Sequence, residues 1–254
     1  MNITLLQKTL SILTIRVIWS LYLLCLFFFG NDEAIAGQLA ERLAHFPQWE
    51  KITVVQPAVG DLVYPDWMLG DWQVTSTLVD LVAPLAPDIV TPGFEGNRQF
   101  LNVPISFPVK FVEEKKVVAD RAFNGLSLAR AYLGDNTVLS VKVDPDSPNR
   151  QITFLRGERQ LVSIVTKRAT ESLPLGFITT EVFQQLFKGG SRPYFNSVES
   201  TTAYHKLPTS DPAIEADQVT AVYLSPQDAD YFTAGSHPVA LYRYRLEFFP
   251  PRTP

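Results

Sequence analysis

The dominant pattern along the chain is an alternation of apolar and polar residues with a period of two. Residues 72–78, 139–144 and 241–248 each place apolar side chains on one face and mainly polar ones on the other. This alternation is typical of β-strands with one buried face. Weaker versions of the same pattern predict further strands over 151–156, 160–168, 197–205 and 217–224.

Turn signals separate these segments, for example Gly134-Asp135-Asn136 and Asp144-Pro145-Asp146. Short strands at such spacing predict an all-β domain, an antiparallel barrel or a sandwich. The 19 prolines all follow residue 36 and leave little room for long helices. We therefore expect one all-β domain over residues 37–254.

Two segments have helical spacing instead. Residues 37–48 carry apolar side chains one turn apart, and residues 125–133 follow Asn124 as an expected N-cap and end at Gly134. Residues 180–188 fit a helix or a strand equally well. The proline-rich stretch 80–108 predicts a long loop, which we interpret as a flap over the barrel.

The first 36 residues have the composition of a secretory signal peptide. Two basic residues precede an apolar run over residues 17–29, and Ala34-Ile35-Ala36 follows as an A-x-A cleavage site. The run is about 13 residues long, shorter than the roughly 20 that a membrane-spanning helix needs. We expect cleavage after Ala36 and export; an uncleaved N-terminal membrane anchor is the alternative.

Charge and composition exclude several classes of function. The net charge is −4, which argues against a nucleic-acid-binding surface. The single cysteine, Cys25, lies in the leader, so the processed chain would have neither a disulfide nor a thiolate nucleophile. The histidines His45, His205 and His237 are not at metal-ligand spacing. The sequence therefore predicts no metal, no cofactor and no catalytic residue.

Gly70-Asp71-Trp72, at the start of the first clear strand, resembles the Gly-x-Trp signature of lipocalin-like (calycin) barrels. The resemblance implies a lipocalin-like barrel with a short N-terminal helix, in which Trp72 closes one end. It also implies that Arg243 or Arg245 of the last strand stacks on Trp72 through a cation–π contact. An open β-sandwich is the alternative fold.

Longer sequence words resemble an uncharacterised exported family of cyanobacteria and plant plastids. They are YPDWMLGDW at 64–72, TPGFEGN at 91–97, ISFPVKF at 105–111 and VVADRAFNGLSLARAYLG at 117–134. The resemblance implies a location in the thylakoid lumen or the periplasm. It transfers no catalytic residue.

Two arginines in largely apolar segments are the strongest candidates for an ion pair or a ligand contact. Arg98 follows Gly96-Asn97, and Arg121 follows Asp120. One interpretation is a structural ion pair that holds the 80–108 loop on the barrel, because an unpaired buried charge is costly. The other is an anchor for a ligand carboxylate or phosphate at the barrel mouth. Tyr242 and Tyr244 are the expected aromatic ligand contacts.

Three functions are compatible with these features. The first is an exported, non-enzymatic barrel that binds a small hydrophobic molecule: a pigment, a quinone or a lipid. The second is a lumenal or periplasmic assembly factor for a membrane complex, with a filled barrel and an exposed apolar patch on the flap. The third, an enzyme such as a pigment isomerase, has no residue that selects it.

Overall fold

The computed structural model describes residues 37–89, 93–190 and 192–251. The expected leader, with its cleavage motif and Cys25, lies outside these residues. The strands are β1 (Gln56–Pro57), β2 (Gly70–Val82), β3 (Pro104–Glu113), β4 (Val117–Ala119), β5 (Val138–Asp144), β6 (Ser147–Leu155), β7 (Arg159–Leu173), β8 (Gly176–Lys188), β9 (Tyr194–Lys206), β10 (Ile214–Tyr223) and β11 (Ala240–Phe249). The helices are α2 (Gln38–Ala44), η1 (Asp66–Met68), η2 (Glu95–Phe100), α3 (Arg121–Leu133) and α4 (Tyr231–Ala234).

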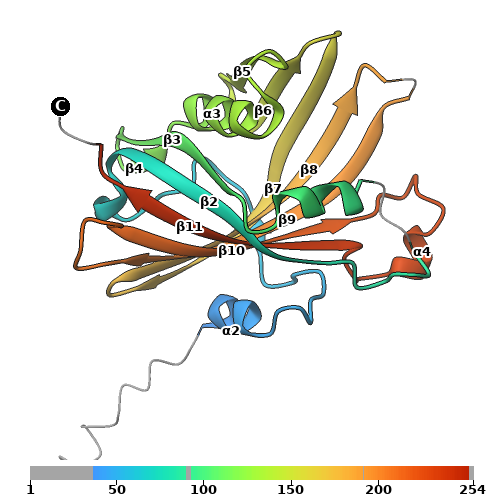
Figure 1. Ribbon diagram of the computed structural model, residues 1–254, viewed down its shortest axis with the longest axis horizontal. Coiled ribbons are helices and arrows are strands. Elements are labelled where there is room, and N and C mark those ends of the chain that lie inside the picture. The colour runs from blue at the N-terminus through green and yellow to red at the C-terminus, as the bar shows by residue number, and fades with distance from the viewer. Residues whose placement is uncertain (1–36, 90–92, 191, 252–254) are drawn as a thin grey trace, which may run out of the picture. The chain divides into compact units, whose positions relative to one another are not determined.

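All eleven strands belong to one antiparallel sheet with the order β4-β3-β2-β11-β10-β9-β8-β7-β6-β5, and β1 pairs with β7. The sheet curls into a half-barrel whose end strands, β4 and β5, do not pair in the described part of the chain (Figure 1). Helix α3 lies between the two ends, in contact with β3, β5 and β6. The prediction of an all-β, barrel-like fold is confirmed; the seam between its ends is bridged by a helix.

The first turn of α3 fixes that helix to the sheet. The Asp120 carboxylate accepts a hydrogen bond from the Phe123 N–H at 3.0 Å and caps the helix. Asn124, the expected N-cap, instead bonds both main-chain groups of Lys110, at 2.7 and 3.0 Å. The helix begins four residues earlier than the sequence predicts, because Asp120 supplies the cap. Its end at Gly134, with a φ of +85°, agrees with the prediction.

The proline-rich stretch is shorter than expected, since β2 extends to Val82 and β3 begins at Pro104. Pro104 and Pro108 of β3 lie six and two residues before Lys110, so all three main-chain nitrogens point to the same side of the strand. The N–H of Lys110 points away from β2, to Asn124. Prolines in this register remove no hydrogen bond from the β2–β3 ladder, which explains why a strand tolerates them.

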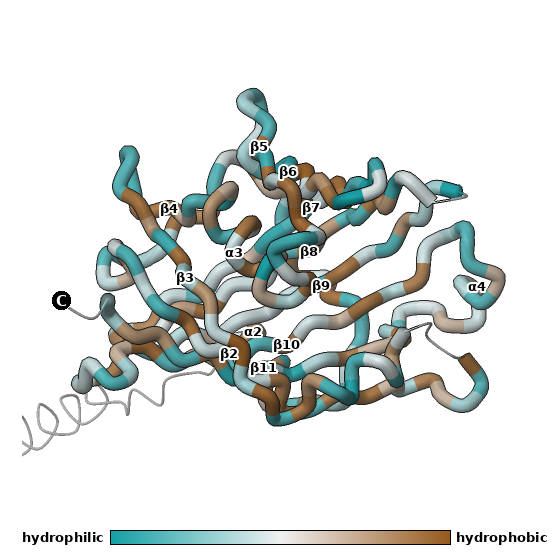
Figure 2. The backbone as a smooth tube through the Cα atoms, turned by 45° about the horizontal axis from the view of Figure 1, so that its top comes forward, coloured by the Kyte–Doolittle hydropathy of each residue, from teal (hydrophilic) through white to brown (hydrophobic). Residues whose placement is uncertain are grey.

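Hydrophobic side chains cover both faces of the sheet. The concave face carries one cluster, which includes Val74, Phe107, Leu246 and Phe248. The convex face packs against α2 and the segment that follows it, through residues such as Leu39, Leu43, Trp49, Val219 and Leu241. Figure 2 shows the hydrophobic stretches along the strands and the hydrophilic tips of the β3–β4 and β5–β6 hairpins. The ambiguous residues 180–188 belong to strand β8.

A buried carboxylate anchors α2 on the convex face. Glu199 is 1% exposed and accepts hydrogen bonds from Arg42 Nε at 2.9 Å and from the Tyr223 hydroxyl at 3.0 Å. Arg42 also stacks over Trp49, 4.1 Å from the ring centroid. Burial raises the pKa of Glu199 above its ordinary value, although Arg42 and Tyr223 oppose the shift. The link between α2 and the sheet is thus sensitive to pH.

This shift predicts how Glu199 affects stability. A carboxyl group with a raised pKa in the folded state favours folding below its unfolded pKa, near 4.5, and that contribution is lost as the pH rises through the folded value. Glu199→Gln should therefore flatten the stability profile just above pH 4.5. Urea unfolding of the wild type and of Glu199→Gln between pH 4 and pH 8 measures the two stability profiles. Parallel profiles would contradict the assignment.

Candidate functional site

A cavity of about 670 Å³ lies between α3 and the concave face of the sheet. Its volume is within the range that binds small organic molecules, roughly 300–1,000 Å³. Seven of its lining residues come from α3: Arg121, Asn124, Gly125, Leu128, Ala129, Tyr132 and Leu133. The others come from strands β2, β3, β4 and β6 to β11 and from the segment before β2. The helix that bridges the seam is therefore also one wall of the cavity.

Apolar side chains form much of the cavity wall. Phe107, Leu161, Leu246 and Phe248 line it from the sheet, and Leu128 lines it from α3. No residue of α3 is buried, and Leu128 is 44% exposed although it faces the cavity. A helix that covers a solid core buries one apolar stripe. Here the space beneath the helix is open, and its apolar wall is accessible to a ligand.

Uncharged polar groups project into the same space. Gln218 and Thr220 of β10, Gln185 of β8 and Gln151 of β6 line the cavity together with Ser76. These side chains supply amides and hydroxyls that donate and accept hydrogen bonds. A few convergent polar groups in an apolar cavity are typical of sites that orient a small ligand.

Four tyrosines add hydroxyl groups to the cavity wall: Tyr64, Tyr132, Tyr204 and Tyr244. Burial raises the pKa of Tyr204 to about 12 and also raises the pKa of the other three. All four phenols are therefore protonated at neutral pH. Tyr132 already shares a hydrogen bond of 3.1 Å with Ser76, which links α3 to β2.

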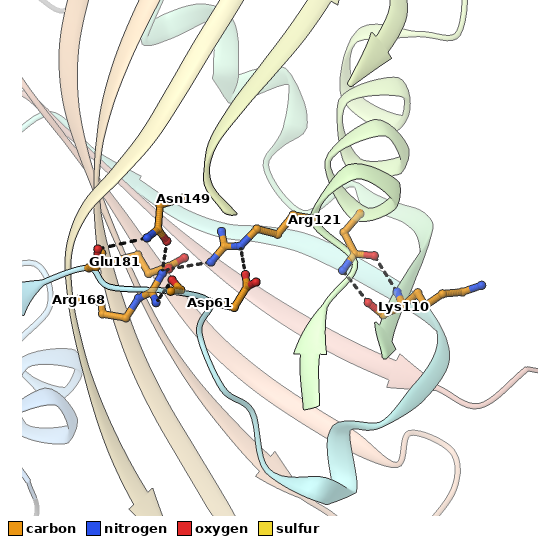
Figure 3. A network of polar contacts seen from close by, with 9 residues as sticks. Asp61, Lys110, Arg121, Asn149, Arg168 and Glu181 are labelled. Atoms are coloured by element: carbon orange, nitrogen blue, oxygen red, sulfur yellow. Dashed lines mark hydrogen bonds and ion pairs between the residues drawn. The ribbon is translucent and has the colours of Figure 1, made fainter. Parts of the chain in front are cut away.

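A charged network borders one part of the cavity (Figure 3). Glu181 Oε1 accepts hydrogen bonds from Arg121 Nη2 at 3.2 Å and from Arg168 Nη2 at 2.8 Å. Arg121 also pairs with Asp61 at 3.0 Å, and Arg168 Nη2 bonds the Asn149 side chain at 2.6 Å. Arg121 and Glu181 line the cavity themselves. The network ties the segment before β2 to α3, β7 and β8.

The charges in this network balance. Two guanidinium groups, those of Arg121 and Arg168, face two carboxylates, those of Asp61 and Glu181. Burial alone would lower the pKa of Arg121, but Glu181, Tyr64 and Asp61 raise it, so the group stays charged. The structure thus places Arg121 in an ion-pair network, with Asp61 and Glu181 in place of the expected 80–108 loop. Among the described residues that line the cavity, Arg121 is the one cation, and its charge is balanced within this network.

The other expected ligand residues are divided between two places. Tyr244 lines the cavity, whereas Tyr242 packs on Phe94 with ring centroids 5.9 Å apart. The Tyr242 hydroxyl accepts a hydrogen bond of 2.9 Å from Asn97, so a hydrogen bond and a ring contact hold the flap. Arg98 is half-exposed and pairs with Glu95 within η2. Arg98 is not among the residues that line the cavity.

The Gly-x-Trp motif lies where the chain enters β2. Gly70 has a φ of +122°, and an added Cβ would meet nothing within 4 Å, so the backbone conformation rather than space favours glycine. Trp72 is half-buried against the concave-face cluster, and its Nε1 donates a hydrogen bond of 2.8 Å to the Met68 carbonyl. Its ring meets Phe248 edge-on, with centroids 6.4 Å apart.

The two arginines of β11 have other partners than Trp72. Arg243 pairs with Asp217 at 2.6 Å and stacks over Phe46 at 5.3 Å from the ring centroid. Arg245 lies 3.8 Å from Glu247 on its own strand. Both alternate along β11 with Tyr244, Leu246 and Phe248, whose side chains pack on the concave face. The arginines therefore lie on the convex face, where Arg243 meets Phe46 of the segment after α2. The expected cation–π contact with Trp72 fails because strand alternation points these arginines to the convex side.

Sequence reasoning missed the polar lining of the cavity. Gln218 and Thr220 occupy the inward register of β10, and Ser76 does so in β2. Polar residues at inward positions of long strands conflict with a solid core. That conflict was the available signal for a cavity. The partners of Arg121, Asp61 and Glu181, are each 60 residues away in sequence and had no comparable signal.

Over 37–89, 93–190 and 192–251, no group of three or more His, Cys, Asp or Glu side chains is placed to hold a metal ion. Within the same ranges, no helix combines the length and apolar character needed to cross a membrane.

The chain belongs to a known sequence family. Residues 56–252 match the family model described as Domain of unknown function (DUF6816). The match begins at β1, extends beyond β11, and so includes the whole sheet, α3 and the cavity. Comparisons with curated proteins and with solved structures gave no match.

Proposed function

We propose that this member of the DUF6816 family is an exported, non-enzymatic binding protein for a small hydrophobic molecule with an uncharged polar group. The cavity of about 670 Å³ beneath α3 carries the proposal. Pigments, quinones and lipids are the classes to test. The periplasm or the thylakoid lumen is the proposed location, in keeping with the expected leader and with the resemblance to an exported family. Quinones fit best, because their carbonyl oxygens accept hydrogen bonds without a charge.

The balance of polar groups supports an uncharged ligand. The guanidinium of Arg121 already has two carboxylate partners, Glu181 and Asp61. A fatty-acid carboxylate there would meet an arginine whose charge two carboxylates already balance, and would add an uncompensated negative charge to a partly buried site. The amides of Gln151, Gln185 and Gln218, in contrast, can bond carbonyl or hydroxyl oxygens without any charge being exposed.

An assembly factor for a membrane complex is the second candidate. One observation favours it: Phe187, Tyr194 and Phe195, beside the β8–β9 turn, are 38–41% exposed. Phe187 and Tyr194 stack loosely, with ring centroids 6.1 Å apart. This patch lies on the β8–β9 hairpin, whereas the sequence analysis expected one on the flap. Pull-down from solubilised membranes, with a Phe195→Ser control, tests this alternative.

Identification of a co-purifying ligand is the direct test. Native mass spectrometry and organic extraction of protein purified from its own cells should reveal an apolar molecule in a one-to-one ratio. An extract without any such molecule, from protein that also fails to bind added quinones, would contradict the proposal.

Filling the cavity should abolish binding. Ala129 lines the cavity from α3, and Ala129→Phe places a ring in the space the ligand would occupy. The affinity for the uncharged probe N-phenyl-1-naphthylamine, followed by fluorescence, should fall at least about tenfold. Ser127→Phe on the same helix is the matched control, because Ser127 does not line the cavity. Equal affinities for the two variants would place the probe elsewhere.

A further inference from the structure

The carboxylate of Glu171 lies against the first described residue of the chain. Glu171 is in β7, and its Oε1 accepts a hydrogen bond of 2.8 Å from the Leu39 N–H of α2. Its Oε2 is buried and has no hydrogen-bond partner among the described residues. A buried carboxylate oxygen without a partner is uncommon, because its desolvation is not compensated. Oε2 of Glu171 therefore needs a hydrogen-bond donor or a positively charged group beside it.

Gly37 occupies the space in front of this oxygen. A Cβ built on Gly37 would overlap both Oε1 and Oε2 of Glu171. The φ of Gly37 is −65°, which any residue adopts, so close approach explains the glycine here. The Glu171 carboxylate thus occupies the position that a Cβ of residue 37 would take. The main-chain nitrogen of Gly37 is bonded to the same Cα as that Cβ would be, so it lies close to the carboxylate.

Gly37 is also the residue that follows the cleavage motif Ala34-Ile35-Ala36. We propose that Gly37 is the mature N-terminus and that its α-ammonium group forms an ion pair with the Glu171 carboxylate. A peptidase adds water across the Ala36–Gly37 bond: the carbonyl carbon of Ala36 gains the oxygen as a carboxylate, and the nitrogen of Gly37 becomes an ammonium. Only after this cleavage does the Gly37 nitrogen carry three N–H donors and a positive charge.

Other contacts of α2 with the sheet hold Gly37 close to Glu171. Arg42, one turn into the same helix, is bound to the buried Glu199 of β9. Leu39 and Leu43 pack into the convex-face cluster, at 2% and 5% exposure. Helix α2 therefore has its own attachment to the sheet, and Gly37 is placed before any ion pair with Glu171 forms. Neither the cavity nor its ligand enters this inference.

The site of processing is tested first. The full chain, expressed in a bacterial host with a secretory pathway and recovered from the periplasm, should have an intact mass that begins at Gly37. A retained leader, or a first residue other than Gly37, would overturn the proposal. Gly37→Ala keeps the cleavage motif acceptable, yet its Cβ overlaps Glu171; it should be processed normally and unfold at a lower temperature.

The ion pair is tested on the processed protein. A carboxylate partner raises the pKa of an α-amino group above its ordinary value of about 8, which lowers the fraction of reactive free amine. Near pH 7, acylation of Gly37 should be about tenfold slower in the folded than in the unfolded protein, for a shift of one unit. Peptide mapping gives the rate, with exposed lysines as internal references.

Glu171→Gln separates the ion pair from simple burial of the amine. This variant removes the charge but keeps the size of the side chain, so the acylation rate of Gly37 should return toward the unfolded value. If wild type and Glu171→Gln react equally slowly, the amine is shielded by burial and the ion pair is disproved. Correct processing with an unshifted rate in wild type would disprove it too.

Discussion

Glu181→Gln is expected to lower the free energy of unfolding by about 3 kcal/mol, the cost of breaking a buried ion pair on one side. Glu181 is 9% exposed and accepts from both Arg121 and Arg168. Its neutralisation leaves two guanidinium groups to share one carboxylate, that of Asp61. Chemical denaturation at pH 7 measures the change.

The same variant should alter ligand preference. With Glu181 neutral, Arg121 has a spare positive charge at the cavity, so a fatty-acid carboxylate should bind where wild type excludes it. Glu95→Gln is the control, since Glu95 pairs with Arg98 on the exposed η2 and should leave stability and binding unchanged. Unchanged stability of Glu181→Gln would show that Arg121 and Arg168 do not depend on this carboxylate.

Leu241→Ala is expected to destabilise the protein by about 3 kcal/mol, within the range of large-to-small changes in a close-packed core. Leu241 is fully buried in β11, in the cluster that holds α2 on the convex face. Thermal unfolding monitored by circular dichroism follows the loss. Leu139→Ala is the matched control: Leu139 is 58% exposed in β5, and its truncation should cost little. Similar losses for both leucines would contradict this account of the core.

The strands were the most predictable part of the fold. Residues 72–78 and 241–248 alternate because one face of each strand meets a core and the other meets solvent or another layer. Residues 180–188 were ambiguous because Val182, Phe183, Leu186 and Phe187 are spaced as on one face of a helix. In the strand, Val182 packs on the convex cluster whereas Gln185 lines the cavity. Local propensity does not distinguish a strand covered on two faces from a helix.

The site was less predictable than the fold. Arg121 and Tyr244 were identified as candidates, and both line the cavity. Arg98 and Tyr242 were placed with them, but strand register and the flap put them elsewhere. The partners of Arg121 come from distant segments, and only the curl of the sheet brings them together. Pairing across such distances is set by topology, which no short sequence window contains.

The helix-bridged seam has an energetic consequence for entry to the interior. A barrel closed by strand pairing can admit a molecule only at its ends or by breaking a ladder of main-chain hydrogen bonds. Here α3 is held to β3 at its first turn by Asn124, which bonds both main-chain groups of Lys110, and near its end by the Tyr132–Ser76 bond. Displacement of that end of α3 would open a lateral entrance to the cavity while every strand stays paired with its neighbours. The rate at which a ligand enters and leaves would then depend on the movement of one short helix.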